Sequence, residues 1–119
     1  MNIIIILASA SKNEIVEEWH SPDGLGYYRK YANGWVEQGG RANTGNNDYG
    51  SIETVQLFTP MKTSTYLVMA SHTSGKYGFL INYCDLEHIV YNSLTTTSFK
   101  LESCSHFEYM YWKVEGFYK

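Results

Sequence analysis

Four histidines are the side chains of this sequence best suited to holding a metal ion, but they lie at least 16 residues apart. A zinc site built within one element takes ligands that are only a few residues apart. This spacing leaves two alternatives open. A metal site could take one histidine from each of several strands, or it could take the same histidine from three copies of the chain on the axis of a trimer. We therefore predict no metal site and no cofactor from the four, which are His20, His72, His88 and His106.

Two glutamates beside aromatic residues are the candidates for acid–base chemistry. Hydrolysis of a glycosidic bond uses a pair of carboxylates, one of them in an apolar setting. Glu108 lies between Phe107 and Tyr109, and Glu37 follows an aromatic and an apolar residue. Strand alternation places Glu108 on the face opposite to its aromatic neighbours. The sequence has no G-x-S-x-G motif and no G-x-G-x-x-G motif, so it predicts a protein that is not an enzyme.

Tyrosines in the predicted loops and turns offer a different chemistry, which is the binding of a sugar or of a protein surface. A tyrosine presents a flat apolar ring with a hydroxyl group, and it binds with little loss of side-chain entropy. Neighbouring asparagine and aspartate side chains supply orienting hydrogen bonds. The binding candidates lie in a polar loop, a turn and a polar insertion, and they are Tyr49, Tyr77, Asp85, His88, Tyr91 and Asn92.

Size and composition indicate one β-rich domain of 119 residues. Charged residues make up 18% of the chain, below the value of about 25% usual for globular domains. Eleven tyrosines contribute to an aromatic content of 16%. The net charge is −3, and no basic cluster exceeds Arg29-Lys30. Nucleic acid is therefore not predicted as a partner, because the phosphate backbone requires clustered positive charge.

Short apolar runs separated by turn residues predict strands throughout the chain, and no segment has a helical pattern of useful length. Residues 65–71 (TYLVMAS) are almost continuously apolar and predict a central strand. Residues 98–103 alternate, with Phe99 and Leu101 on one face. About eight strands with frequent turns predict an antiparallel β-sandwich or barrel. The other predicted strands are residues 12–19, two strands within 27–40, 51–58, 77–83, 88–91 and 106–114.

Residues 27–40 (YYRKYANGWVEQGG) are the most distinctive part of the sequence. Asn33-Gly34 between two aromatic runs predicts a β-hairpin with a two-residue type I′ turn, in which both residues have positive φ. Together with the preceding Glu-x-Trp, this pattern resembles the C-terminal domain of bacteriophage tail fibres. The residues that carry the resemblance are Glu17, Trp19, Tyr28, Arg29, Tyr31, Asn33, Gly34, Trp35, Val36, Glu37, Gln38, Gly39 and Gly40.

The resemblance extends more loosely over residues 14–118, through Phe58-Thr59-Pro60 and the aromatic last strand. It implies a small β-sandwich, assembled as a homotrimer at the distal tip of a fibre in the virion after synthesis in the host cytoplasm. The implied partners are the fibre shaft and a glycan or protein of the host surface, for which the tyrosine-rich loops are the receptor-binding candidates. The alternatives are a structural module that ends or trimerises the fibre, and a fragment of a polysaccharide depolymerase.

The aromatic residues of the resemblance have two interpretations. Tyr27, Tyr28, Tyr31 and Trp35 together would make a platform for stacking a sugar. Alternatively, aromatic residues of the motif fill the sandwich core or a seam between subunits of the trimer; these are Trp19, Tyr28, Tyr31 and Trp35. We favour the second interpretation, because large aromatic side chains on strands are the usual material of cores and interfaces.

The N-terminal residues and the two cysteines remain. The apolar run of residues 3–7 is shorter than the core of a signal peptide and too short to cross a membrane. We expect residues 1–13 to oligomerise and join the shaft, and residues 14–119 to form the tip domain.

Cys84 and Cys104 form a disulfide or remain two buried thiols; free thiols are favoured because phage proteins assemble in a reducing cytoplasm.

Overall fold

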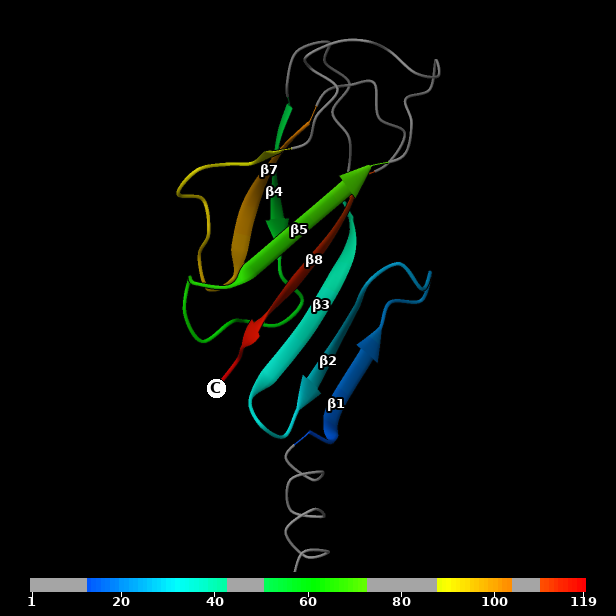
Figure 1. Cartoon of the computed structure of the whole chain (residues 1–119). Coiled ribbons are helices and arrows are strands. Elements are labelled where there is room, and N and C mark those ends of the chain that lie inside the picture. The colour runs from blue at the N-terminus through cyan, green and yellow to red at the C-terminus, as the bar shows by residue number, and fades with distance from the viewer. Residues whose placement is uncertain (1–12, 43–50, 73–87, 104–109) are drawn as a thin grey trace, which may run out of the picture.

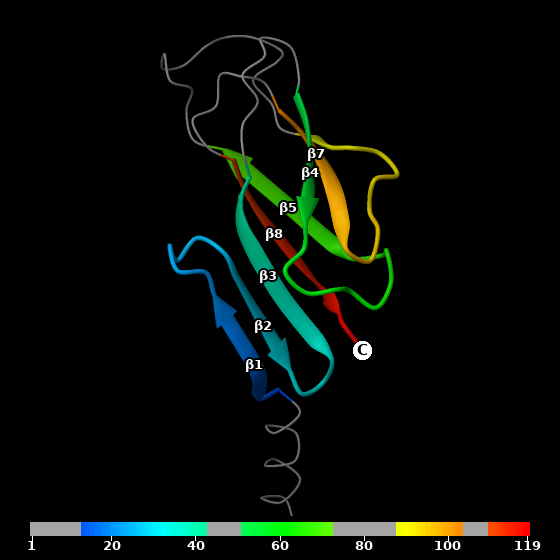
Figure 2. The same ribbon diagram turned by 180° about the vertical axis from the view of Figure 1, so that it is seen from behind.

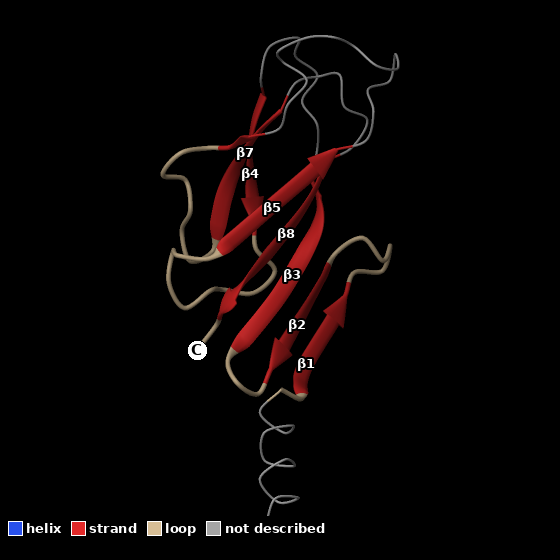
Figure 3. Cartoon of the chain, viewed as in Figure 1, coloured by secondary structure: helices blue, strands red, loops and turns tan. Residues whose placement is uncertain are grey.

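The structure is a computed structural model that describes residues 13–42, 51–72, 88–103 and 110–119. All regular elements in these ranges are β-strands, as Figure 3 shows, which confirms the predicted all-β class. The strands, labelled in Figure 1, are β1 (Ile15–His20), β2 (Tyr27–Tyr31), β3 (Trp35–Ala42), β4 (Ser51–Gln56), β5 (Leu67–His72), β6 (His88–Ile89), β7 (Ser98–Ser103) and β8 (Met110–Phe117).

These strands form two antiparallel sheets. The larger sheet has the order β1-β2-β3-β8-β5, and the smaller has the order β4-β7-β6. Seen from both sides in Figures 1 and 2, the smaller sheet lies over the β5–β8 side of the larger one, and β1 and β2 extend away from it. The sandwich prediction is confirmed, with one sheet only partly covered by the other.

The core lies between the two sheets. Alternate residues of β8, namely Met110, Trp112 and Val114, point inward and are at most 5% exposed. Phe99 and Leu101 of β7 meet them from the smaller sheet, which confirms the alternation predicted for residues 98–103. The rings of Phe99 and Trp112 pack edge to face, with centroids 5.7 Å apart. The other buried members of the cluster are Val36, Val55 and Met61.

The prediction of a central strand at residues 65–71 is wrong, because among the described strands β5 lies at the edge of the larger sheet and pairs with β8. Val68 and Ala70 pack against the core, but Leu67 and Met69 are 60% and 50% exposed. An apolar run reports what the two faces of a strand contact, and it carries no information on how many edges are paired. The middle strand of the five is β3, and β8 lies between β3 and β5.

The last strand continues further along the sequence than the pattern predicts. The prediction of residues 106–114 ends it at Val114, whereas β8 spans Met110–Phe117; residues 106–109 lie outside the described residues. Glu115 and Gly116 resemble a strand end, yet they pair with Glu37 and Val36 of β3. The predicted strand at residues 77–83 lies outside the described residues.

The predicted β2–β3 hairpin is confirmed, but its turn is not of type I′. Gly34 has a φ of 94°, whereas Asn92 is the one non-glycine residue with positive φ in the ranges the structure describes. The amide of Gly34 donates to the carbonyl of Tyr31 (3.0 Å), and the Asn33 side chain accepts from the amide of Trp35 (3.0 Å). The connection is therefore a three-residue loop that closes with a left-handed glycine.

The two ends of the larger sheet carry different features. At one end the hairpin loop lies beside the start of β1, where Asn33 donates a hydrogen bond to Asn13 (2.9 Å). At the other end Ala42 of β3 and His72 of β5 both pair with Met110 of β8. The strand ends that flank residues 43–50, 73–87 and 104–109 thus lie together, opposite the hairpin loop. We call the end of the larger sheet that carries the hairpin loop and Asn13 the hairpin end, and the end that carries Ala42, His72 and Met110 the far end.

Candidate functional site

Gln38, from the Glu-Gln-Gly-Gly part of the motif, is completely buried. Its amide nitrogen donates to the carbonyl of Thr59 (2.9 Å), and its amide oxygen accepts from the backbone amides of Phe58 (2.8 Å) and Thr59 (3.2 Å). A buried polar group left without such a partner costs about 1–3 kcal/mol. Gln38 therefore fastens the segment that follows β4 to the middle of β3.

The two glycines after Gln38 make room for aromatic rings on both faces of β3. A Cβ atom at Gly40 would lie 3.3 Å from the rings of Phe58 and Trp112. A Cβ atom at Gly39 would lie 2.7 Å from the backbone oxygen of Trp112 and 3.0 Å from the ring of Tyr27. Phe58 stacks on Trp112 with centroids 5.7 Å apart. This part of the motif thus serves packing.

The motif's aromatic residues lie around the core rather than in it. Trp19 is 36% exposed, stacks on Tyr28 with centroids 5.9 Å apart, and packs against Phe58 at 4.8 Å. Tyr31 and Trp35 are half-buried. None of the four motif aromatics belongs to the buried cluster of the described residues, so the interpretation as core filling is not supported. The subunit seam and the sugar platform stay predictions.

Charged side chains of β1 are held by partners on β2. The hydroxyl of Tyr28 donates to Glu17 (2.5 Å), and the ammonium group of Lys30 lies 3.4 Å from the same carboxylate. Both hold the pKa of Glu17 below its ordinary value, the hydrogen bond more than the charge. Glu18 lies 3.1 Å from the guanidinium of Arg29. Because these groups are exposed they add little stability, but they favour this register of the edge strand.

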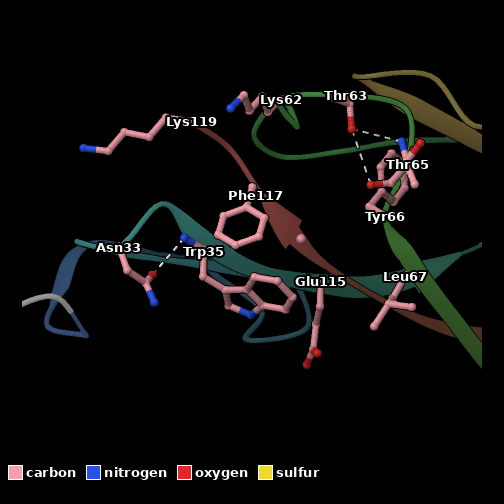
Figure 4. Close-up of a pocket in the computed structure, with 11 residues that line it drawn as sticks. Asn33, Trp35, Lys62, Thr63, Thr65, Tyr66, Leu67, Glu115, Phe117 and Lys119 are labelled. Carbon is pink, nitrogen blue, oxygen red and sulfur yellow. Dashed lines mark hydrogen bonds between the residues drawn. The ribbon is translucent and has the colours of Figure 1, made fainter. Parts of the chain in front are cut away.

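An open groove with a volume of about 650 Å³ lies at the hairpin end. Its centre is the pair of Trp35 and Phe117, whose rings are perpendicular with centroids 5.0 Å apart. In Figure 4, Lys62 and Lys119 extend on one side of this pair and Glu115 on the other. The remaining lining residues are Asn33, Thr63, Thr65, Tyr66, Leu67 and Gly116.

Backbone hydrogen bonds hold the walls of this groove in place. The amide of Lys62 donates to the carbonyl of Phe117 (2.8 Å), and the amide of Tyr118 donates to the carbonyl of Gly34 (2.8 Å). Trp35 and Phe117 are also opposite each other in the β3–β8 ladder. The groove is therefore formed before a ligand arrives. Sequence reasoning missed Lys62, Phe117 and Lys119, since no local pattern joins residue 62 to residues 117–119.

Tyr91 and Asn92 are the predicted binding residues whose side chains the structure describes. The amide of Ser93 donates to the carbonyl of Val90 (3.2 Å), which closes a β-turn in which Asn92 has a φ of 57°. Asparagine tolerates this left-handed conformation better than most residues. The turn leaves Tyr91 89% exposed. His88 begins β6, and Tyr49, Tyr77 and Asp85 lie outside the described residues.

Within the described ranges, no group of three or more histidine, cysteine, aspartate or glutamate side chains is arranged to hold a metal ion. The same ranges contain no helix that is long and apolar enough to cross a membrane. The surface described above instead offers aromatic rings, ammonium groups and carboxylates. These are groups suited to holding a ligand.

Comparison with known proteins gives matches among solved structures alone. No protein-family model matches the chain, and no curated protein matches it. An N-truncated R1-type pyocin tail fibre superposes with a TM-score of 0.57 and 13% identity, over 98% of this chain and 97% of the other. This chain has the fold of a pyocin tail-fibre fragment. At such an identity the likeness shows the fold alone.

A second structure extends this match to longer fibres. The C-terminal residues 323–691 of an R2 pyocin fibre of P. aeruginosa superpose with a TM-score of 0.55 and 18% identity, over 85% of this chain. The match covers 26% of that fibre fragment, so the present fold corresponds to about a quarter of its length. The resemblance to tail-fibre C-terminal domains, predicted from the motif around Asn33-Gly34, is confirmed as a resemblance of fold.

Proposed function

We propose that this chain is the tip domain of a tail fibre, or of a similar virion spike, and that it attaches the particle to the surface of a host cell. The observation that carries the proposal is the fold shared with a pyocin tail fibre over 98% of the chain. An aromatic groove and an exposed tyrosine turn support a role in binding rather than in catalysis. The location that follows is the virion, after assembly in the host cytoplasm.

The proposed assembly is a homotrimer joined to the shaft through residues 1–13, with residues 14–119 as the tip domain. Leu67 and Met69, on the outer face of edge strand β5, support a contact between copies because they are large, apolar and at least half exposed. The partners are further copies of the chain, the shaft, and a host glycan or protein. Neither nucleic acid nor membrane insertion has a part in this proposal.

The proposed receptor-binding residues belong to segments that adjoin the strand ends of the far end in sequence or, for Tyr91 and Asn92, that follow β6. A fibre chain arrives from its shaft at the N-terminal side, and Asn13 lies at the hairpin end. The far end then meets the host first, and loops carried on a rigid scaffold are the usual place for binding residues. Three weak sites on one trimer would raise the avidity without any new contact. The candidates are Tyr49, Tyr77, Asp85, His88, Tyr91 and Asn92.

The test is adsorption of the purified protein to host cells, measured beside thermal melts. We expect the single variants Tyr49→Ala, Tyr77→Ala and Tyr91→Ala to weaken adsorption while the melting temperature stays unchanged. Thr96→Ala is the control. Thr96 is exposed and lies just before Ser98, the first residue of β7. If all three tyrosine variants adsorb as well as the parent, the receptor site lies elsewhere.

A structural module that ends or trimerises the fibre is the second candidate function. The exposed apolar side chains of β5 favour it, since they suit a subunit contact. A stable trimer that fails to adsorb to any host cell would support this candidate over the first. The depolymerase alternative predicts the release of reducing ends from host polysaccharide, which we do not expect.

A further inference from the structure

We propose that the groove at the hairpin end is a binding site for an acidic sugar unit. The sugar ring would lie against Trp35 and Phe117, and its carboxylate or phosphate group would be held by Lys62 and Lys119. The inference rests on the proposed function for the source of that sugar, a glycan of the host surface. It concerns the hairpin end of the larger sheet, and not the far end that meets the host first in the proposed function.

The aromatic pair supplies the stacking surface. Trp35 is half-buried and Phe117 is 51% exposed, so the pair offers ring area to a ligand while staying anchored in the β3–β8 ladder. The flat apolar faces of sugar rings are suited to such aromatic surfaces. A volume of about 650 Å³ is also within the range of about 300–1,000 Å³ common for small-ligand sites.

The charges around the groove select an anionic ligand. Glu115 is already paired with Lys113, whose ammonium lies 2.9 Å from it. Lys62 and Lys119 have no carboxylate within ion-pairing distance in the part of the chain that the structure describes. Two ammonium groups on one side of the rings in Figure 4 therefore remain to meet an anion. This local excess is opposite in sign to the net charge of −3.

A second copy of the chain is the other possible occupant, because Leu67 borders the groove and is 60% exposed. Covering the groove with an apolar strand would remove water from two ammonium groups without supplying them a partner, which is costly. An acidic sugar provides both the ring contact and the counter-charge. The observations on this surface therefore favour the sugar.

The experiment is an NMR titration of the full-length protein that follows the indole N–H signals of its three tryptophans. The probes share one backbone and differ in charge: neutral cellotriose, triglucuronate with carboxylates, and cellotriose 6-phosphate. We expect an acidic probe at millimolar concentration to shift the Trp35 signal and to leave that of the buried Trp112 unchanged. The carboxylate and phosphate probes distinguish the two sources of negative charge. Trp35→Phe assigns the signal while keeping an aromatic ring in place.

A charge variant tests the role of the lysines. Lys62→Gln combined with Lys119→Gln should weaken binding of the acidic probe about tenfold, as expected for the loss of charge-assisted hydrogen bonds. Lys100→Gln is the control, because Lys100 is exposed on β7 and does not line the groove. If the acidic probes leave Trp35 unshifted, or if cellotriose binds as well as they do, the inference is wrong.

Two further measurements separate this inference from the proposed function. If the parent protein adsorbs to host cells and the double lysine variant adsorbs equally well, the groove has no part in attachment and the inference fails while the function stands. If the parent does not adsorb, the proposed function fails, and the titration alone decides whether the groove binds acidic sugars. A lower oligomeric mass for the double lysine variant in ultracentrifugation would assign the groove to a subunit contact and overturn the inference.

Discussion

Replacement of Gln38 by methionine tests whether one buried amide fixes the segment after β4. Methionine is unbranched and similar in size to glutamine, so the substitution removes the polar groups without opening a large cavity. Three hydrogen bonds, to Thr59 twice and to Phe58 once, are lost together. At a net value of about 1 kcal/mol each, the expected loss in the free energy of unfolding is about 3 kcal/mol.

This loss would be a large share of the stability of a single domain, which is typically about 5–15 kcal/mol. Urea unfolding followed by far-UV circular dichroism measures the difference. Near-UV circular dichroism adds a local readout, because Phe58 stacks on Trp112 and packs against Trp19. We expect that aromatic signal to weaken even in the folded variant, as the segment carrying Phe58 becomes less fixed.

Gln56→Met is the matched control, since Gln56 is exposed at the end of β4. It should change the free energy of unfolding by less than about 0.5 kcal/mol. A loss below about 1 kcal/mol for Gln38→Met would refute the reasoning, because it would mean that the three backbone groups find other partners. Equal losses in both variants would point to a general effect of methionine on the strands.

Three further expectations concern packing, pH and the thiols. Gly39→Ala should destabilise more than Gly40→Ala in urea unfolding, because its Cβ atom meets the backbone oxygen of Trp112, whereas that of Gly40 meets only side-chain rings. The hydrogen bond from Tyr28 lowers the pKa of Glu17 in the folded protein. The ionised carboxylate therefore adds stability above its unfolded pKa, and this stability is lost as the pH falls through the lower folded pKa. Between about pH 6 and about pH 3, the melting temperature of Glu17→Gln should fall less than that of the parent. Denatured intact mass without reductant should show two free cysteine thiols, and a mass lower by two hydrogen atoms would establish a disulfide.

The sequence predicted the parts of the fold that depend on local chemistry. Asn33-Gly34 predicted the hairpin, because a left-handed residue between two strand-forming runs leaves few other structures. The alternation of residues 98–103 predicted which side of β7 faces the core. Local chemistry did not settle which strand is central, because β5 and β8 both carry apolar runs and only the register with β3 distinguishes them.

The sequence of the hairpin loop did not determine its turn type. A type I′ turn and a three-residue loop both place a left-handed glycine at position 34, so the dipeptide favours either. Pairing across the hairpin decides between the two. The amide of Gly34 donates to the carbonyl of Tyr31, which makes a three-residue loop in place of a two-residue turn. The side chain of Asn33 then caps the amide of Trp35.

The candidate site was predictable only in part for a similar reason. Tyr91 was a binding candidate because it lies in the predicted insertion of residues 85–92, and the structure leaves it 89% exposed. The groove combines the hairpin loop, the approach to β5 and the end of β8. Its lysines are ordinary surface residues when viewed along the chain, and only the folded register places Lys62 beside Phe117.

Part of the motif that carries the family resemblance serves packing inside the chain and is not available to a ligand. The side chain of Gln38 is fully buried and bonded within the chain, and Gly39 and Gly40 act by lacking a Cβ atom. Groups whose interactions are already satisfied inside the fold have little left to offer a ligand. Under the proposed function, differences in host recognition would come from residues other than these three, such as Tyr91 or the lysines of the groove.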